Sequence, residues 1–194
     1  MHKREFLVRG ATLIGGTALL MSGCTTTPMS SKPKRGAARR QEIDDNVNAT
    51  LDRLYSTVQG SNELVTRARG VLVFPSVLAA GIVAGGEYGE GALRVNGKTK
   101  DYYSTVTGSF GLQIGAQSKA IIFLFMTRQA LDNFVQSSGW TAGVDASVAI
   151  IKVGANGQLD LRTSAEPVSV IILTNTGLMA NLNVEGTKVT KLQD

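Results

Sequence analysis

The 194-residue chain carries a formal net charge of +5 that is unevenly divided along its length. Residues 1–40 hold eight Lys or Arg and one Glu, whereas residues 41–194 hold twelve Lys or Arg and fourteen Asp or Glu. The larger part is mildly acidic, which argues against a nucleic-acid-binding surface. Cys24 is the only cysteine and His2 the only histidine. Beyond Cys24 the chain therefore excludes disulfides, His- or Cys-based catalysis and the usual zinc sites.

Residues 1–23 are predicted to be a signal peptide. Basic residues come first, and the apolar stretch Ala11–Met21 is shorter than the roughly 20 residues that a membrane-spanning helix needs. Small residues then lead directly to Cys24. This ending resembles a lipobox, in which the thiol is alkylated with diacylglycerol and becomes the first residue of the mature protein. The alternative is an ordinary signal peptide with an incidental cysteine.

Two further signals bear on export and sorting. Lys3-Arg4-Glu5-Phe6-Leu7 resembles a twin-arginine signal with Lys in the first basic place, and general secretion is the alternative. Thr25 follows the cysteine, whereas Asp at that place tends to retain proteobacterial lipoproteins in the inner membrane. We therefore expect a lipid-anchored protein of the cell envelope, on the periplasmic face of the outer membrane.

Residues 24–40 are expected to be a lipidated basic tether. The segment contains Pro, Ser and Thr, with almost nothing apolar to bury. It is either a solvated spacer or an electrostatic contact with anionic headgroups, each basic group contributing up to about 1 kcal/mol. The basic residues concerned are Lys32, Lys34, Arg35, Arg39 and Arg40.

Residues 41–194 are expected to form one domain that begins with helices. Apolar residues at helical spacing predict an amphipathic helix over residues 41–59, ended by Gly60, and a short second helix from Ser61 to about Arg69. The acidic polar face of the first helix favours packing on the core over lying in a membrane interface. Its expected apolar face is Ile43, Val47, Leu51, Leu54, Tyr55 and Val58, and its polar face is Asp44, Asp45, Asn48, Asp52 and Arg53.

From Gly70 onward the pattern predicts strands with hairpin turns and only one helix among them. Asn96-Gly97 is a strong hairpin signal, and Thr127 is expected to cap a helix whose apolar face is Ala130, Leu131, Phe134 and Val135. The predicted fold is α+β, an antiparallel barrel or sandwich with N-terminal helices and one inserted helix. The expected strands are 71–74 (stopped by Pro75), 81–88, 91–95, 102–117, 120–126, 140–153, 160–162, 168–173, 178–184 and 188–192, with further turns at 155–157 and 175–177.

The glycine-rich segment Gly85–Gly91 lacks the order of a phosphate-binding loop, so its glycines are expected to mark a bulge, a bend or close approach of another backbone. Gly89 and Gly91 share one face of a strand, as do Gly111 and Gly115, and such a face admits an acyl chain or a packed element. Glu87 and Glu90 lie three apart, which on a strand places them on opposite faces and makes them a poor catalytic pair. No metal site, cofactor or enzymatic activity is predicted.

Several segments together resemble the SYLF-domain lipid-binding family. They are Ala68–Pro75, GGEYGEGALR from Gly85, Tyr102-Tyr103-Ser104, GLQIGAQSKAIIFLFMT from Gly111, SSGWTAGVDASVA from Ser137 and GLMANLNVEGTKVTKL from Gly177. The resemblance runs from about residue 45 to the C-terminus. It implies a lipid-binding module, since eukaryotic relatives bind phosphoinositides and fungal ones also bind actin. In a bacterial envelope the expected partner is membrane phospholipid.

Two hypotheses follow. The first is an envelope lipoprotein that binds a phospholipid or phosphoinositide-like headgroup, and the second is a structural or protein-interaction module with an unknown envelope protein partner. For the first, Trp140 is expected at a headgroup boundary, where an apolar ring with a polar edge is suited, and a nearby lysine is expected to hold phosphate. The alternative is a core tryptophan with surface lysines. The candidate residues are Lys119, Trp140, Tyr102, Tyr103 and Lys152.

Overall fold

The computed structural model describes residues 36–80, 84–110, 118–151, 159, 166–174, 177–178 and 184–193. Its helices and strands all belong to one compact unit, Lys34–Asp194. In chain order they are α1 (Gly36–Thr57), α2 (Ser61–Arg67), β1 (Gly70–Ala80), β2 (Ala84–Val95), β3 (Lys98–Phe110), β4 (Ser118–Phe125), α3 (Arg128–Gln136), β5 (Trp140–Thr141), β6 (Val148–Ile150), β7 (Val168–Thr174), β8 (Gly177–Leu178) and β9 (Lys188–Lys191).

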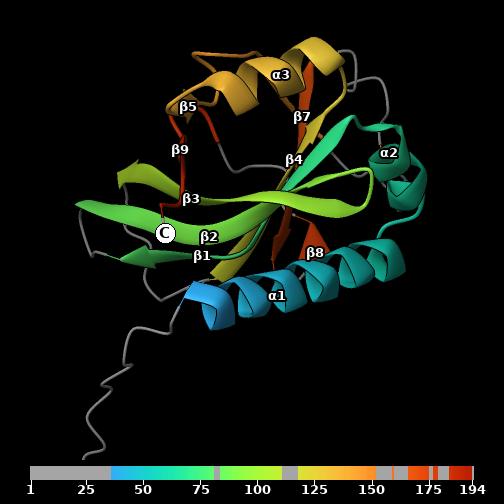
Figure 1. The fold of residues 1–194 in the computed structure, drawn as a ribbon, viewed down its shortest axis with the longest axis horizontal. Helices are drawn as coiled ribbons and strands as arrows, with labels where there is room; N and C mark the ends of the chain where they lie inside the picture. Colours follow the sequence, from blue (N-terminus) through green and yellow to red (C-terminus); the bar gives the residue numbers. More distant parts are fainter. Residues whose placement is uncertain are drawn as a thin grey trace, which may run out of the picture. The chain divides into compact units, whose positions relative to one another are not determined.

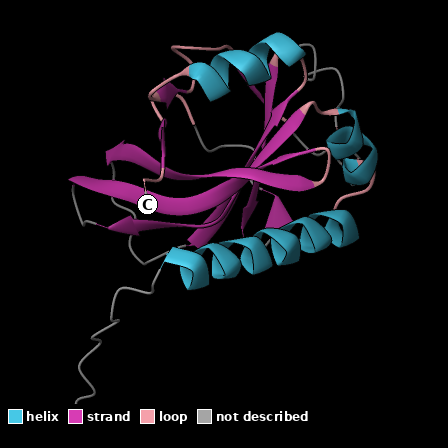
Figure 2. Cartoon of the chain, viewed as in Figure 1, coloured by secondary structure: helices cyan, strands magenta, loops and turns pink. Residues whose placement is uncertain are grey.

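The strands form a single curved sheet with helices on both faces (Figures 1 and 2). The strand order is β5-β9-β3-β2-β1-β4-β7-β6, and β8 pairs with β7. Every named ladder is antiparallel except β6–β7. The predicted α+β class with an antiparallel sheet and one inserted helix is thus confirmed, in the barrel-like form of one curled sheet.

The sheet separates two hydrophobic cores, and β4 contributes side chains to both. Ile121, Phe123 and Phe125 join the core that α3 covers, and Ile122 and Leu124 join the core that α1 and α2 cover. Successive side chains of a strand point to opposite faces, so a strand buried on both sides must be apolar throughout. This explains the unbroken apolar run that predicted a buried strand here.

Helix α1 begins at Gly36, five residues before the expected start, so the predicted start of the first helix is wrong. Residues 37–40 are Ala and Arg, which are strong helix formers, and the helix continues through them to the buried residues Ile43, Val47 and Leu54. Tyr55, expected on the apolar face, is exposed. Among the described residues, no helix has the length and apolar character needed to cross a membrane.

Strand β1 does not end at Pro75, contrary to the prediction. The pairing of β1 with β2 shifts register between Val73 and Ser76, and then continues to Ala80. Proline donates no backbone hydrogen bond, so a bulge is one of the few places where a paired strand tolerates it. The expected strands 81–88 and 91–95 are likewise continuous from Ala84 onward as β2.

Local turn and cap signals are confirmed. Asn96 and Gly97 have positive φ values of 52° and 75°, as the two central residues of a tight hairpin turn require. The Thr127 side chain accepts a hydrogen bond from the Ala130 backbone N–H at 3.1 Å and begins α3. Both features depend on neighbouring residues, which is why the sequence was sufficient to predict them.

The single strand expected over 140–153 is two short strands, β5 and β6. A turn with Gly143 at a φ of +80° separates them, and they pair with different neighbours, β9 and β7. Pairing partners far away in the chain therefore decide where these strands end. The predicted strand 160–162, the turn at 155–157, most of the strand 178–184 and the face with Gly111 and Gly115 lie outside the described residues.

Candidate functional site: a basic pocket at the start of helix α1

The first turns of α1 are joined to β2 by an ion pair. Arg39 donates from Nε to Glu90 Oε2 at 2.8 Å and from Nη2 to Glu90 Oε1, and the Tyr88 hydroxyl also donates to Oε1, at 2.6 Å. The hydrogen bonds from Arg39 hold the pKa of Glu90 below its usual value. Arg39 is therefore part of the folded domain and not of a solvated tether.

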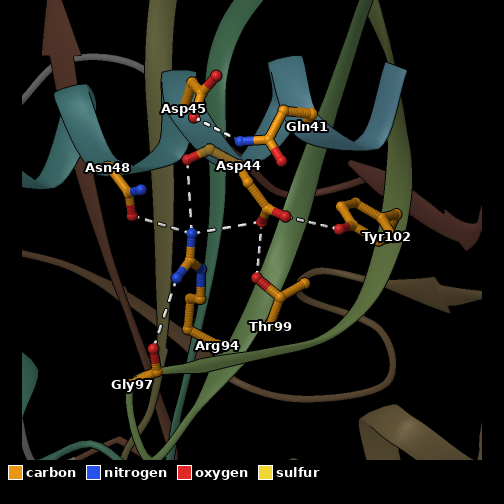
Figure 3. A network of polar contacts seen from close by, with 8 residues as sticks. All are labelled: Gln41, Asp44, Asp45, Asn48, Arg94, Gly97, Thr99 and Tyr102. Carbon is orange, nitrogen blue, oxygen red and sulfur yellow. Dashed lines mark hydrogen bonds and ion pairs between the residues drawn. The ribbon is translucent and has the colours of Figure 1, made fainter. Parts of the chain in front are cut away.

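A second polar network fixes the helix one turn further on (Figure 3). Asp44 Oδ1 accepts from the Thr99 hydroxyl at 2.6 Å, and Asp44 Oδ2 accepts from the Tyr102 hydroxyl at 2.7 Å. Arg94 donates from Nη2 to Asn48 Oδ1 at 2.9 Å and lies 3.3 Å from Asp44 Oδ1. Asp44 was expected on the solvent face, and this is wrong because its carboxylate contacts β3 and the Arg94 side chain.

Between these contacts and the end of β9 lies a pocket of about 440 Å³. The Arg40 guanidinium lies over the Tyr102 ring, 5.6 Å from its centroid, and Lys191 Nζ lies 2.7 Å from Asp101 Oδ1. Four cationic side chains and one carboxylate therefore belong to the lining. The lining residues are Gly36, Arg39, Arg40, Ile43, Lys100, Asp101, Tyr102, Lys191, Leu192 and Gln193.

The lining determines what the pocket can do chemically. Its size falls in the range of small-molecule sites, roughly 300–1,000 Å³. Guanidinium groups provide planar pairs of donors suited to phosphate or carboxylate oxygens, and lysine adds a mobile point charge. The lining holds four cations and one carboxylate, Asp101, so the described side chains suit binding of an anion.

The structure places the two predicted tyrosines on opposite faces of β3. Tyr102 faces α1 and lines the basic pocket. Tyr103 contacts Phe134 with ring centroids 4.9 Å apart, and Trp140, only 2% exposed, packs edge-on against Phe123 at 5.6 Å. Trp140 is thus a core residue and not at a headgroup boundary, because its pairing with Val189 of β9 places it on the same face of the sheet as that buried residue.

Lys119, the predicted phosphate ligand, is paired with a carboxylate. Its Nζ lies 2.7 Å from Glu87 Oε2, and both side chains are nearly buried. Glu87 lies on the face away from α1, whereas Glu90 contacts α1, which confirms that these two glutamates point to opposite sides. The structure therefore joins Lys119 to Glu87 and does not bring it to Tyr102.

Burial raises the pKa of Tyr103 to about 12, from a usual value of 10.0, with a smaller contribution from Asp101. The unfolded chain ionises this group first, so its contribution to stability is complete below pH 10 and is lost as pH rises toward 12. Tyr103→Phe is expected to remove this loss, roughly 2 kcal/mol between the two pH values. Denaturant titrations of both proteins from pH 9 to 12 measure the free energy of unfolding at each pH. If this free energy changes with pH equally in both proteins, the raised pKa of Tyr103 is wrong.

Several predicted site residues lie outside the described residues: Cys24, Lys32, Lys34, Arg35 and Lys152. Of the predicted tether cations, Arg39 and Arg40 line the pocket. The sequence did not identify Lys100 and Lys191 as site residues, because only the sheet order places the start of β3 and the end of β9 beside α1.

The comparisons with known proteins agree with the resemblance seen in the sequence. No curated protein matches the chain. A family model described as "Ysc84: Las17-binding protein actin regulator" matches residues 106–194, from the second half of β3 to the C-terminus. SYLF domains are the domains of this family, a family of binding modules and not of known enzymes. Residues 106–194 therefore carry a match to the Ysc84, or SYLF, family.

Proposed function

We propose that this chain is a lipid-anchored envelope lipoprotein whose domain binds anionic phospholipid headgroups. The observation that carries the proposal is the pocket at the start of α1, where Arg39, Arg40, Lys100 and Lys191 gather around a space of about 440 Å³. An otherwise mildly acidic domain thus concentrates cations at one place. Anionic headgroups attract such clusters by about 1 kcal/mol per basic group near the surface.

The position of the pocket in the chain supports this proposal. Gly36, the first residue of α1, lines the pocket, and eleven residues separate it from the lipobox-like Cys24. Eleven residues reach at most about 38 Å when extended and average about 18 Å as a flexible coil. A lipid on Cys24 would therefore hold the pocket close to the bilayer, on the periplasmic face of the outer membrane in our proposal.

A protein-interaction module is the second candidate, and the family description favours it. That description names a Las17-binding protein and actin regulator. Under this proposal, the surface around α1 binds another envelope protein, and the pocket binds an acidic side chain of that partner in place of a phosphate.

Vesicle binding tests the first candidate. The chain from Thr25 keeps the whole unit Lys34–Asp194, and it contains no cysteine to acylate. Arg40→Gln combined with Lys100→Gln is expected to weaken binding to vesicles containing phosphatidylglycerol about tenfold, because two exposed cations are removed from the pocket. The difference should shrink as salt is raised, since screening acts within roughly 8 Å at physiological ionic strength.

Arg53→Gln is the matched control, because Arg53 is exposed on the same helix and does not line the pocket. Removal of its charge should leave vesicle binding nearly unchanged. The proposed headgroup site is wrong if the pocket variant binds as tightly as the Arg53→Gln chain, or if the unmodified chain does not bind anionic vesicles. Either result would support the protein-interaction module.

A further inference from the structure

Three large apolar side chains lie exposed in one row across the sheet. Leu78 is 51% exposed, Tyr88 48% and Val106 51%. Leu78 is the direct cross-strand partner of Tyr88, and Tyr88 is the direct partner of Val106, so all three point to the same face of β1, β2 and β3. That face is the one on which α1 packs, because Glu90, two residues after Tyr88, contacts Arg39.

The row is exposed because the first residue of α1 lies short of it, so the helix does not cover it. Arg39, in the first turn of the helix, contacts Glu90, and Tyr88 lies one same-face position further out on β2. Figure 1 shows the ends of β1, β2 and β3 extending past the blue start of α1. Beyond that point, the same face that buries Ala92 under the helix presents apolar side chains to solvent.

The row continues into the basic pocket through one set of contacts. The Tyr88 hydroxyl donates to Glu90, Glu90 accepts from Arg39, and Arg39 lines the pocket. An apolar patch bordered by cations complements the surface of an anionic bilayer, where headgroups meet acyl chains. A tyrosine side chain suits that boundary because its ring is apolar and its hydroxyl group is polar.

The short connection in sequence between Cys24 and the start of α1 argues for the same occupant. The segment that follows Cys24 reaches the domain at Gly36, which lines the basic pocket. A lipid on Cys24 would therefore bring this face, and not the α3 face, toward the membrane. A second copy of the chain fits less well, because symmetric contact through the row would bring Arg39, Arg40 and Lys100 of both copies together.

We propose that Leu78, Tyr88 and Val106 form a membrane-contacting row that enters the headgroup–acyl boundary of the bilayer while the basic pocket holds a headgroup. This inference rests on the proposed lipid-binding function and adds how the domain is oriented on the membrane. The extended ends of β1, β2 and β3 face the lipid, and α3 on the opposite face of the sheet points away from it.

Two aspartate variants test the row with the chain from Thr25 and vesicles of phosphatidylethanolamine and phosphatidylglycerol. Leu78→Asp and Val106→Asp are each expected to weaken binding at least tenfold, and the loss should persist at high salt because apolar contact is not screened. Val144→Asp is the matched control, since Val144 is 77% exposed in the turn between β5 and β6. It should bind like the unmodified chain.

Leu78→Ser and Val106→Thr keep the test valid if an aspartate unfolds the strand. A direct readout uses Val106→Trp, whose emission should shift to shorter wavelength on vesicles and be quenched by brominated acyl chains. Val144→Trp should not respond, and Trp140 contributes the same buried background to both proteins.

The outcomes separate the two proposals. If Arg40→Gln with Lys100→Gln weakens binding while both row variants bind normally and Val106→Trp emission is unchanged, the membrane-contacting row is wrong and the headgroup site stands. If no variant changes binding, both proposals fail. If the lipid-free chain sediments as a dimer that Leu78→Asp dissociates, the row is a contact between copies, and the proposed orientation is wrong.

Discussion

Cys24→Ser is expected to move nearly all of the protein from the membrane fraction to an unprocessed or soluble form. Each buried CH₂ of an acyl chain contributes about 0.8 kcal/mol, so the several chains of a lipidated cysteine make a stable anchor, whereas basic residues alone give reversible binding. Cell fractionation followed by a high-salt wash measures the effect. The wash matters because it removes protein that Arg40 and Lys100 would hold electrostatically on their own.

A conservative neighbouring change controls for damage to the signal peptide. Thr25→Ser keeps Cys24 and the residues before it, and this variant should remain in the membrane fraction. Mass spectrometry of the mature N-terminus should find acyl chains on Cys24 in the unmodified protein. Complete retention of Cys24→Ser on salt-washed membranes would show that the lipobox interpretation is wrong and that the domain alone provides the attachment.

Features that depend on adjacent residues could be predicted from the sequence. The Asn96-Gly97 turn, the Thr127 cap and the apolar run of β4 all carry local signals, and the structure confirms each of them. The alternating faces of β2 also follow from spacing alone, which is why Glu87 and Glu90 were correctly separated.

Features that depend on distant partners could not be predicted. Asp44 carries a charge, so spacing alone assigned it to the solvent face, but Thr99, Tyr102 and Arg94 provide it with hydrogen bonds at the sheet. Pro75 normally ends a strand, and only the register shift between β1 and β2 accommodates it. In both cases the deciding contact lies far away in the chain.

The residues of the candidate site could likewise be predicted only in part from the sequence. Arg39, Arg40 and Tyr102 could be selected from the sequence as cationic and aromatic groups, but their association in one pocket requires the order β9-β3-β2 beneath α1. For Trp140, the local sequence favours a position that distant pairing does not allow. An isolated tryptophan after a glycine resembles a boundary residue, yet pairing of β5 with β9 turns its ring into the core.

The glycines of β2 allow β1 to bend around Pro75. A Cβ placed on Gly89 would lie 2.8 Å from Val77 Cγ2 and 2.9 Å from the Ser76 carbonyl oxygen. These distances are shorter than real Cβ contacts, so the bulged strand occupies the space that a side chain would need. Of the three expected roles of these glycines, close approach of another backbone is the one that Gly89 and Gly91 have, and the occupant of that face is β1 with its side chains.

Gly91→Ala is therefore expected to destabilise the fold by about 3 kcal/mol or more, as severe overpacking in a core does. A Cβ at this position would overlap the Val73 carbonyl oxygen and lie 2.8 Å from the Phe74 ring, and backbone cannot move aside like a flexible side chain. Gly108→Ala is the matched control, because Gly108 is a strand glycine of β3 with nothing within 4 Å of the added Cβ. This change should leave stability unaltered or raise it slightly, by up to about 1 kcal/mol, because alanine restricts the unfolded chain. Denaturant unfolding of both variants measures the difference, and equal stabilities would show that the bulge of β1 does not press on Gly91.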